Sequence, residues 1–147
     1  MSGHDSVDNT PDTMTATWTG GRGFLCRSAS GHEVKTDTAV ASGGDGSAPS
    51  PMELVVLGLI ACTGVDVASI LERMREPLKG LQVAATHERS EDHPRVYTKI
   101  HLTYRLQGDL DEKKVRRAIG LSEDKYCSVS AMLRPGVEIT HEYEIVT

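Results

Sequence analysis

The chain is predicted to fold as a single α+β domain, because its β-type and helix-type segments are grouped along the sequence. Three short β-type runs come first and a long apolar helix follows; two alternating runs, two short helices and a last strand complete the chain. No βαβ alternation suggests a parallel sheet, so antiparallel sheets are expected. A chain of 147 residues can bury about two-thirds of its unfolded surface, and it has no length to spare for a second domain.

The N-terminal third predicts an antiparallel meander of three strands, since turn residues divide it into short β-type runs. The runs and the turns between them are 13–19, Gly20-Gly21, 23–28, Ser30-Gly31 and 33–40. The polar residues 1–13 are predicted to form a flexible terminus, so the folded domain is expected to span 14–147. The segment 41–51 is rich in glycine and proline and is predicted to be an irregular loop.

A long apolar helix is predicted to begin at Ser50 and Pro51. Ser50 is a favoured N-cap, Pro51 suits the first helical position, and Glu53 completes a capping box. The helix is expected to end near Arg75. Residues 54–65 carry no charge, but this stretch is shorter than the ~20 residues of a membrane span. Because it is apolar on every face, we expect the sheets and a second copy of the subunit to cover it.

The C-terminal half predicts an antiparallel hairpin, two short helices and a closing strand. Alternation of apolar and polar residues indicates the strands, and an amphipathic pattern indicates the first of the two helices. The five predicted elements are strands 81–89 and 96–106, helices 109–120 and 125–133, and strand 137–146.

Composition excludes several classes of function. A net charge of −5 without a run of basic residues argues against partners such as nucleic acids and anionic membranes. The first fourteen residues lack the basic and apolar regions of a secretory signal, so a cytoplasmic location is expected. Three cysteines that lie far apart do not resemble the disulfide framework of a secreted domain, so the thiols are expected to be reduced.

The three cysteines occupy different positions. Cys62, in the middle of the apolar helix, is either a small buried side chain or a reactive thiol activated by a nearby cation. Cys127 lies at the expected start of the last helix, where free N–H groups and Lys125 favour a thiolate, and a packed thiol is the alternative. Cys26 lies in a strand beside Arg27, and we interpret it as a structural or incidental thiol.

Other polar side chains give weaker signals. The six histidines lack the spacing of zinc ligands, so neither a metal site nor a cofactor is expected. His87, His101 and His141 lie on predicted strands and form either a histidine cluster on one sheet face or ordinary cross-strand pairs. Asp66 follows Cys62 by one helical turn and requires a partner in so apolar a helix, with an arginine or lysine expected.

Two segments resemble the OsmC/Ohr family of osmotically inducible and organic-hydroperoxide-resistance proteins. They are APSPMELVVLGLIACTGVDV, which contains Cys62, and KYCSVSAML, which contains Cys127 about 65 residues later. The resemblance extends from about Met14 to Val146, and with the segment SASGHEV it looks closest to the YhfA-like branch. It implies an intertwined homodimer in which antiparallel sheets of both subunits wrap two long central helices.

The resemblance also implies a thiol-dependent peroxidase. Cys62 is then the thiolate that attacks a hydroperoxide and becomes a sulfenic acid, and Cys127 condenses with it to a disulfide. In the peroxidase members an arginine from an N-terminal Gly-Gly-Arg turn supports the thiolate, and Arg22 matches that position.

Glu53 matches the family pattern less closely. In the peroxidase members a glutamate directly follows the proline of the helix and fixes the arginine, whereas Met52 stands there in this chain and Glu53 comes next. Glu53 and Cys62 are separated by ~180° around a straight helix and ~13 Å along it, so they cannot touch within one helix. Glu53 is therefore expected either to act through Arg22 or the partner subunit, or to serve only in the capping box.

The sequence as a whole predicts a hydroperoxide reductase, with organic hydroperoxides as preferred substrates and an unidentified thiol as reductant. Two alternatives use the same fold. In the first, a non-enzymatic protein binds an apolar small molecule at the dimer interface beside Cys62. In the second, a stress-response structural or interaction protein contains inert cysteines.

Overall fold

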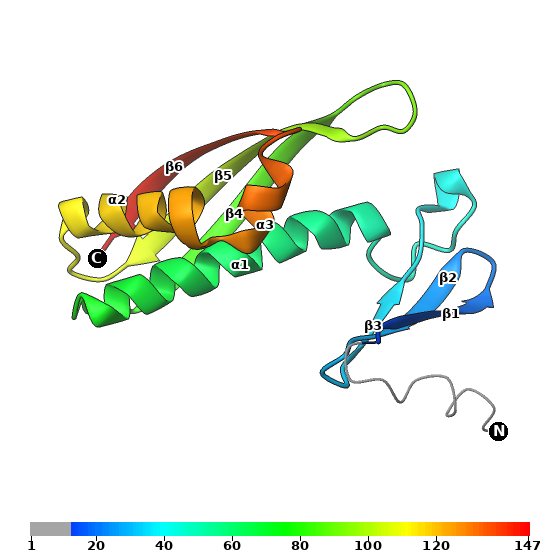
Figure 1. Ribbon diagram of the computed structural model, residues 1–147, viewed down its shortest axis with the longest axis horizontal. Coiled ribbons are helices and arrows are strands. Elements are labelled where there is room, and N and C mark those ends of the chain that lie inside the picture. Colours follow the sequence, from blue (N-terminus) through cyan, green and yellow to red (C-terminus); the bar gives the residue numbers. More distant parts are fainter. Residues whose placement is uncertain (1–12) are drawn as a thin grey trace. The chain divides into compact units, whose positions relative to one another are not determined.

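The computed structural model describes residues 13–147, so the predicted flexible terminus lies outside the described residues except for Thr13. The chain divides into two compact units, one ending at Val55 and the other beginning at Val56. Its strands and helices are shown in Figure 1.

The first unit contains the predicted antiparallel meander. Its strands are β1 (Thr15–Gly20), β2 (Gly23–Arg27) and β3 (Glu33–Thr36), paired in the order β1-β2-β3. Gly20 and Gly21 have φ angles of 109° and 55° in the turn between β1 and β2, a conformation that glycine adopts without a steric cost. The meander is confirmed, although β3 ends at Thr36, four residues earlier than expected.

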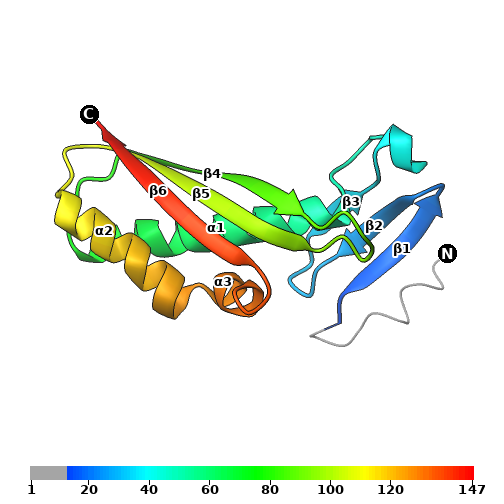
Figure 2. The ribbon, with the colours of Figure 1, turned by 90° about the horizontal axis from the view of Figure 1, so that it is seen from above.

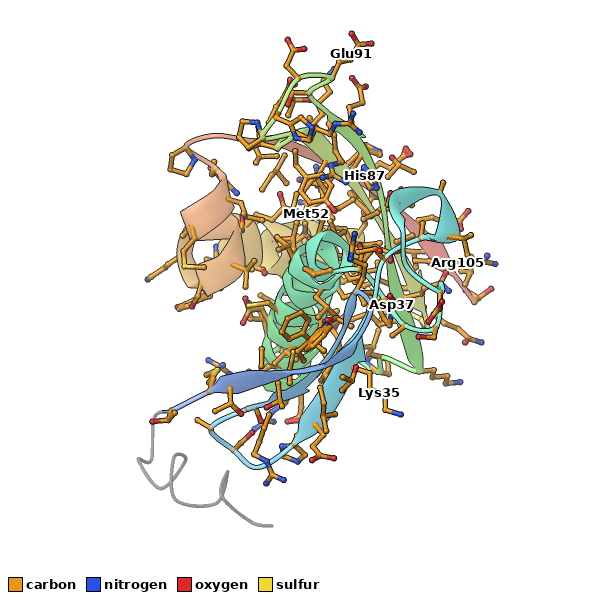
Figure 3. The ribbon with its side chains drawn as sticks, turned by 90° about the vertical axis from the view of Figure 1, so that its right-hand side faces the viewer. Lys35, Asp37, Met52, His87, Glu91 and Arg105 are labelled. Atoms are coloured by element: carbon orange, nitrogen blue, oxygen red, sulfur yellow. The ribbon has the colours of Figure 1, made fainter. Side chains whose placement is uncertain are left out.

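The loop between β3 and the long helix is organised around Asp37. Its carboxylate accepts hydrogen bonds from the backbone N–H groups of Thr38, Asp45 and Ser47 and from the Ser47 hydroxyl. The Ser47 hydroxyl and these N–H groups hold the pKa of Asp37 at about 2. A short 3-10 helix, η2 (Val40–Ser42), overlaps the start of the segment 41–51 that was predicted to be irregular, so that prediction was wrong for Ala41 and Ser42. Figure 3 shows Asp37 beside this loop.

The long helix α1 (Pro51–Arg73) begins at the predicted residue. The Ser50 hydroxyl accepts from the Glu53 N–H at 3.1 Å, and the Glu53 carboxylate accepts from the Ser50 N–H at 2.9 Å, which is the reciprocal capping box. The helix ends two residues before the expected position, because Arg75 adopts a left-handed conformation with φ of 61°. Among the described residues, α1 alone is long and apolar enough to cross a membrane, a property that core helices share.

The second unit contains the sheet β4-β5-β6 and two further helices. The elements are β4 (Gly80–Arg89), β5 (Tyr97–Gln107), α2 (Glu112–Leu121), the π-helical turn η3 (Ser122–Tyr126), α3 (Ser128–Leu133) and β6 (Glu138–Val146). The predicted helices and strands are all present, with bounds shifted by a few residues.

The pairing of the last strand corrects one expectation. The β4 and β5 strands are antiparallel, but β5 and β6 are parallel, with Tyr104 opposite Tyr143. The segment 108–137 is long enough to carry the chain back to the end of the sheet where β5 begins, as a parallel crossover requires. The α+β class is confirmed, and the prediction of antiparallel pairing throughout was wrong for this strand pair.

One face of this sheet carries the core. Alternate residues of β5 are fully buried on it, and α2 contributes buried apolar side chains on the same side. The residues of β5 concerned are Ile100, Leu102, Tyr104 and Leu106, and those of α2 are Val115, Ala118 and Ile119. Figures 1 and 2 show α1 and α2 along the same side of the sheet. Arg105 lies on the other face, where it is exposed and pairs with Glu144 (Figure 3).

Candidate functional site

Cys62 and Cys127 lie side by side in the second unit. Their sulfur atoms and a carboxylate oxygen of Asp66 all lie within 4.8 Å of one another. Cys62 and Asp66 are separated by four residues of α1, a spacing that places both side chains on one face of the helix. Both thiols are free. The structure therefore brings together the two cysteines that the sequence predicts as a pair.

The turn η3 and the start of α3 position Cys127. Its N–H donates to the Ser122 carbonyl at 2.7 Å, and its sulfur accepts from the Ser130 N–H at 3.4 Å as the N-cap of α3. Arg134 donates from one nitrogen to the Glu123 carbonyl at 2.7 Å and to the Ser130 hydroxyl at 2.9 Å. These contacts tie η3 to α3 on both sides of the thiol.

Burial determines the protonation of Cys127. The residue is only 2% exposed, and desolvation raises the pKa of its thiol to about 11. The Ser130 N–H lowers this pKa and the neighbouring Cys62 raises it, each by less than burial does. The predicted N-terminal position is confirmed, and of the two alternatives for Cys127 the burial favours a packed thiol over a thiolate. The Lys125 ammonium group lies over the Tyr126 ring, 5.3 Å from its centroid.

Asp66 has a different partner from the one expected. The Ser122 hydroxyl donates to its carboxylate at 3.0 Å, so the partner is a neutral serine rather than an arginine or lysine. Asp66 is partly buried, and this contact connects α1 to η3 next to the two cysteines. The carboxylate thus lies within reach of both thiols while it is held by a hydroxyl.

A buried polar chain continues from this serine into the core. Thr63 and Ser122 share a hydrogen bond, Thr63 shares another with Tyr104, and the Tyr104 hydroxyl donates to Glu123. Glu123 in turn contacts His141 on β6. Burial raises the pKa of Tyr104 well above its usual range, so its hydroxyl keeps its hydrogen. Apart from His141, these residues stand in no sequence pattern that predicts a site.

The histidines of the sheet do not form a cluster. His101 bonds the Thr140 hydroxyl at 2.7 Å, and His87 packs its ring edge against Tyr97. His141 contacts Glu123 instead. Of the two readings of the sequence, separate pairs are confirmed over a shared cluster.

Arg22 and Glu53 belong to the first unit. The guanidinium group of Arg22 lies against Gly43 in the loop that follows β3, about 3.5 Å from where a Cβ atom would stand. Glu53 uses one carboxylate oxygen in the capping box with Ser50. Cys26 lies within β2, opposite Ala16 and Val34 in the sheet, and is a free thiol.

The cysteine pair with Asp66 also has the donor types that bind zinc. A closed zinc site takes four ligands, whereas this cluster of described residues offers three. A catalytic zinc site takes three protein ligands and keeps one position open, so the number of donors does not by itself separate a thiol pair from a metal centre. Asp66 is already held by the Ser122 hydroxyl.

Comparison with known proteins identifies the family. A model of the OsmC-like protein family matches residues 44–142. Protein YhfA of Escherichia coli strain K12 is 45% identical over 130 residues, which cover 88% of this chain and 94% of that protein. A crystal structure of a hypothetical protein from Aquifex aeolicus VF5 is 30% identical, with a TM-score of 0.77 and coverage of 92% of this chain and 98% of that one.

A more distant structure has the same fold. It is an organic hydroperoxide resistance protein OsmC from Legionella pneumophila, 17% identical, with a TM-score of 0.69 and coverage of 92% and 97% of the two chains. The resemblance found in the sequence, including that to YhfA, is confirmed. The chain belongs to the OsmC-like protein family and has the OsmC/Ohr fold.

Proposed function

We propose that this protein reduces hydroperoxides, with a preference for organic ones, through the thiols of Cys62 and Cys127. The observation that carries the proposal is the placement of both sulfur atoms and the Asp66 carboxylate within 4.8 Å of one another. The Legionella pneumophila structure, which is that of an organic hydroperoxide resistance protein, adds support.

The first step oxidises Cys62. Its thiolate attacks the terminal oxygen of the hydroperoxide, so that a sulfur–oxygen bond forms and the oxygen–oxygen bond breaks. The sulfur loses two electrons and becomes a sulfenic acid, while the departing alkoxide takes one proton and leaves as an alcohol. Cys127 suits the second role, because its raised pKa keeps it a thiol while Cys62 reacts.

The second step joins the two sulfurs. The Cys127 thiol attacks the sulfenic acid sulfur, a disulfide forms, and the hydroxyl of the sulfenic acid leaves as water with the Cys127 proton. A disulfide requires a sulfur–sulfur distance of ~2 Å, so the two sulfur atoms approach each other by at most ~3 Å. A cellular dithiol then restores both thiols and becomes a disulfide itself.

Arg22 is proposed to supply the cation that favours the Cys62 thiolate, as the family resemblance implies. Two glycines open the turn that carries Arg22, and its guanidinium group lies against the loop at Gly43 in the first unit. Glu53 is proposed to act through Arg22, since its own backbone neighbour Ser50 already occupies one carboxylate oxygen.

A homodimer is part of the proposal. In α1, Leu57 is 47% exposed and Val65 is 68% exposed, and a second copy of the chain would remove both from water. In the first unit, Trp18 on β1 is 65% exposed. We propose a cytoplasmic location, where the three free thiols stay reduced.

The test is non-reducing mass spectrometry after one equivalent of cumene hydroperoxide, with hydrogen peroxide in a parallel sample. We expect a loss of two hydrogens in the wild type and a Cys62–Cys127 linkage in its peptides. Cys62→Ser should abolish peroxide consumption. Cys127→Ser should permit a single turnover and leave a sulfenic acid on Cys62 that dimedone traps.

Cys26→Ser is the matched control, because it removes a thiol that lies in the other unit. It should alter neither the linkage nor the labelling. Equal labelling of Cys62 and Cys127, or of neither, would refute the peroxidase. Retention of a bound apolar molecule by all three variants would favour the binding protein, and slow, uniform oxidation would favour inert cysteines.

A further inference from the structure

The polar chain between Asp66 and Glu123 is continuous. Its four contacts are Asp66 Oδ2 to Ser122 Oγ at 3.0 Å, Ser122 Oγ to Thr63 Oγ1 at 2.8 Å, Thr63 Oγ1 to Tyr104 Oη at 2.7 Å, and Tyr104 Oη to Glu123 Oε2 at 2.7 Å. Thr63, Ser122 and Tyr104 are fully buried. Every contact has the length of an O–H···O hydrogen bond, so each needs one hydrogen between its oxygens.

The hydroxyl groups supply too few hydrogens. Ser122, Thr63 and Tyr104 contribute one each, which makes three hydrogens for four contacts. With both terminal carboxylates ionised, two buried oxygens would face each other at less than 3 Å without a hydrogen between them. One additional proton, on either Asp66 or Glu123, gives each contact a hydrogen.

We propose that this chain holds one shared proton and that Asp66 uses it as the acid and base of the cysteine pair. The inference deepens the proposed function and rests on it for the chemistry of Cys62. With the proton on Asp66, every hydroxyl donates toward Glu123; with the proton on Glu123, every hydroxyl donates toward Asp66. A proton therefore passes between the two ends when the three hydroxyl hydrogens shift along the chain.

His141 lies at the far end of the chain. Its Nδ1 is 3.0 Å from Glu123 Oε1, and its side chain is about one-third exposed. Its ring also packs edge-on against Tyr104. Arg134 donates to the Glu123 carbonyl and pairs with Asp124, so its charge lies on the backbone side of Glu123. A protonated His141 favours an ionised Glu123, which places the shared proton on Asp66.

Asp66, at the other end of the polar chain, lies beside the two cysteines. When a dithiol attacks the sulfur of Cys62 in the disulfide, the sulfur–sulfur bond breaks and Cys127 leaves with the bonding pair as a buried thiolate. Asp66 lies within 4.8 Å of that sulfur and gives it a proton. Glu123 is already ionised in that state, so the three hydroxyls then turn to donate toward Asp66, and Glu123 takes a replacement proton from His141, whose Nδ1 lies 3.0 Å away. Thr63, Tyr104, Ser122, Glu123 and His141 are positioning residues in this scheme.

Infrared difference spectroscopy tests the shared proton directly. We expect the wild type at neutral pH to show the carbonyl band of a protonated carboxyl group. Asp66→Asn and Glu123→Gln should each remove it, because either amide supplies an N–H hydrogen to the chain in place of the proton. A wild type without this band, or a band that survives both substitutions, would overturn the proposal.

A double-mutant cycle tests the coupling. The readout is the ratio of Cys62 alkylation rates by iodoacetamide at pH 5.5 and pH 8, measured by mass spectrometry. His141→Gln keeps an N–H donor but cannot titrate, and it should change this ratio by at least about twofold. Thr63→Val removes the Thr63 hydroxyl and interrupts the polar chain with a side chain of similar shape. In this background, His141→Gln should leave the ratio unchanged. The same change in both backgrounds would mean a direct charge effect and would overturn the relay.

A second variant that interrupts the polar chain controls for a folding defect in Thr63→Val. Tyr104→Phe removes the Tyr104 hydroxyl and should abolish the His141 effect as Thr63→Val does. Its matched control is Tyr143→Phe, since Tyr143 lies opposite Tyr104 in the sheet and donates to Glu112 outside the chain. The control should retain the His141 effect. These readouts need no peroxide, so a coupled protein that consumes no hydroperoxide would refute the peroxidase alone.

Discussion

The starts of α1 and α3 are two helix N-termini that both carry a residue with catalytic potential, and the protein uses them differently. At α1, Ser50 and Glu53 bond each other in a closed pair. At α3, Cys127 accepts one N–H group and keeps its sulfur directed at Cys62 and Asp66 from a different helix. A reactive group at a helix start indicates a site when side chains from elsewhere in the fold converge on it.

The largest expected effect concerns the reactivity of Cys127. With its pKa at about 11 instead of 9.0, its thiolate fraction at neutral pH is ~100-fold below that of an ordinary thiol. Alkylation by iodoacetamide should be slower by the same factor and should rise tenfold per pH unit toward pH 11. Peptide mass spectrometry measures it, with the urea-unfolded chain as control. If Cys127 is alkylated at the same rate in the folded protein and in the unfolded chain, burial does not suppress its reactivity and the prediction is wrong.

Arg22→Ala tests whether the first unit supplies a cation to Cys62. We expect alkylation of Cys62 at neutral pH to slow by about tenfold, because a thiolate without an adjacent positive charge is less populated. Arg27→Ala is the matched control, since Arg27 lies on the same sheet and pairs with exposed Glu33. Equal effects of the two substitutions would show that Arg22 has no special role.

Ser50→Ala opens the closed pair at the start of α1. The loss of the capping hydroxyl should lower the free energy of unfolding by about 1 kcal/mol. Urea denaturation measures this. The rate of peroxide consumption by the folded protein should stay unchanged, because the Ser50 hydroxyl accepts from the Glu53 backbone N–H and not from a side chain. A fall in that rate at full folding would show that this helix start belongs to the site.

Glu53→Gln separates the charge of Glu53 from its capping role and has the smallest expected effect. Glutamine also serves in a capping box, so the free energy of unfolding should change by only a few tenths of a kcal/mol. Through Arg22, the oxidation rate of Cys62 should fall by about two- to fivefold, the scale of an exposed ion pair. Stopped-flow mixing with hydroperoxide measures the oxidation rate of Cys62. An unaltered rate would mean that Glu53 serves only in the capping box.

Local signals predicted most of the fold. The Ser50-Pro51 start, the glycine turn between β1 and β2, and the alternation in β4 and β5 depend on residues that are close in sequence, and each was predicted within a few positions. The parallel pairing of β6 was not, because it depends on how far the crossover 108–137 carries the chain. No periodicity in the sequence encodes that distance.

The site was predictable only in part for the same reason. Cys62 and Cys127 were paired through the resemblance to a family, and the structure confirms their proximity. Burial, which dominates the protonation of Cys127, depends on packing that a sequence does not display. The partner of Asp66 was predicted to be basic because an isolated charge attracts an opposite one, yet Ser122 is supplied by a π-helical turn that follows α2.

The parallel crossover also has a consequence for the order in which the chain folds. The hairpin of β4 and β5 joins neighbouring segments and closes early, whereas β6 pairs only after 108–137 has been traversed. Cys127 lies within that late segment, so a newly made chain contains Cys62 before it contains an assembled partner for it. During this interval an oxidised Cys62 has no thiol beside it to prevent irreversible oxidation. For the proposed function, assembly of the segment 108–137 therefore completes the thiol pair as well as the sheet.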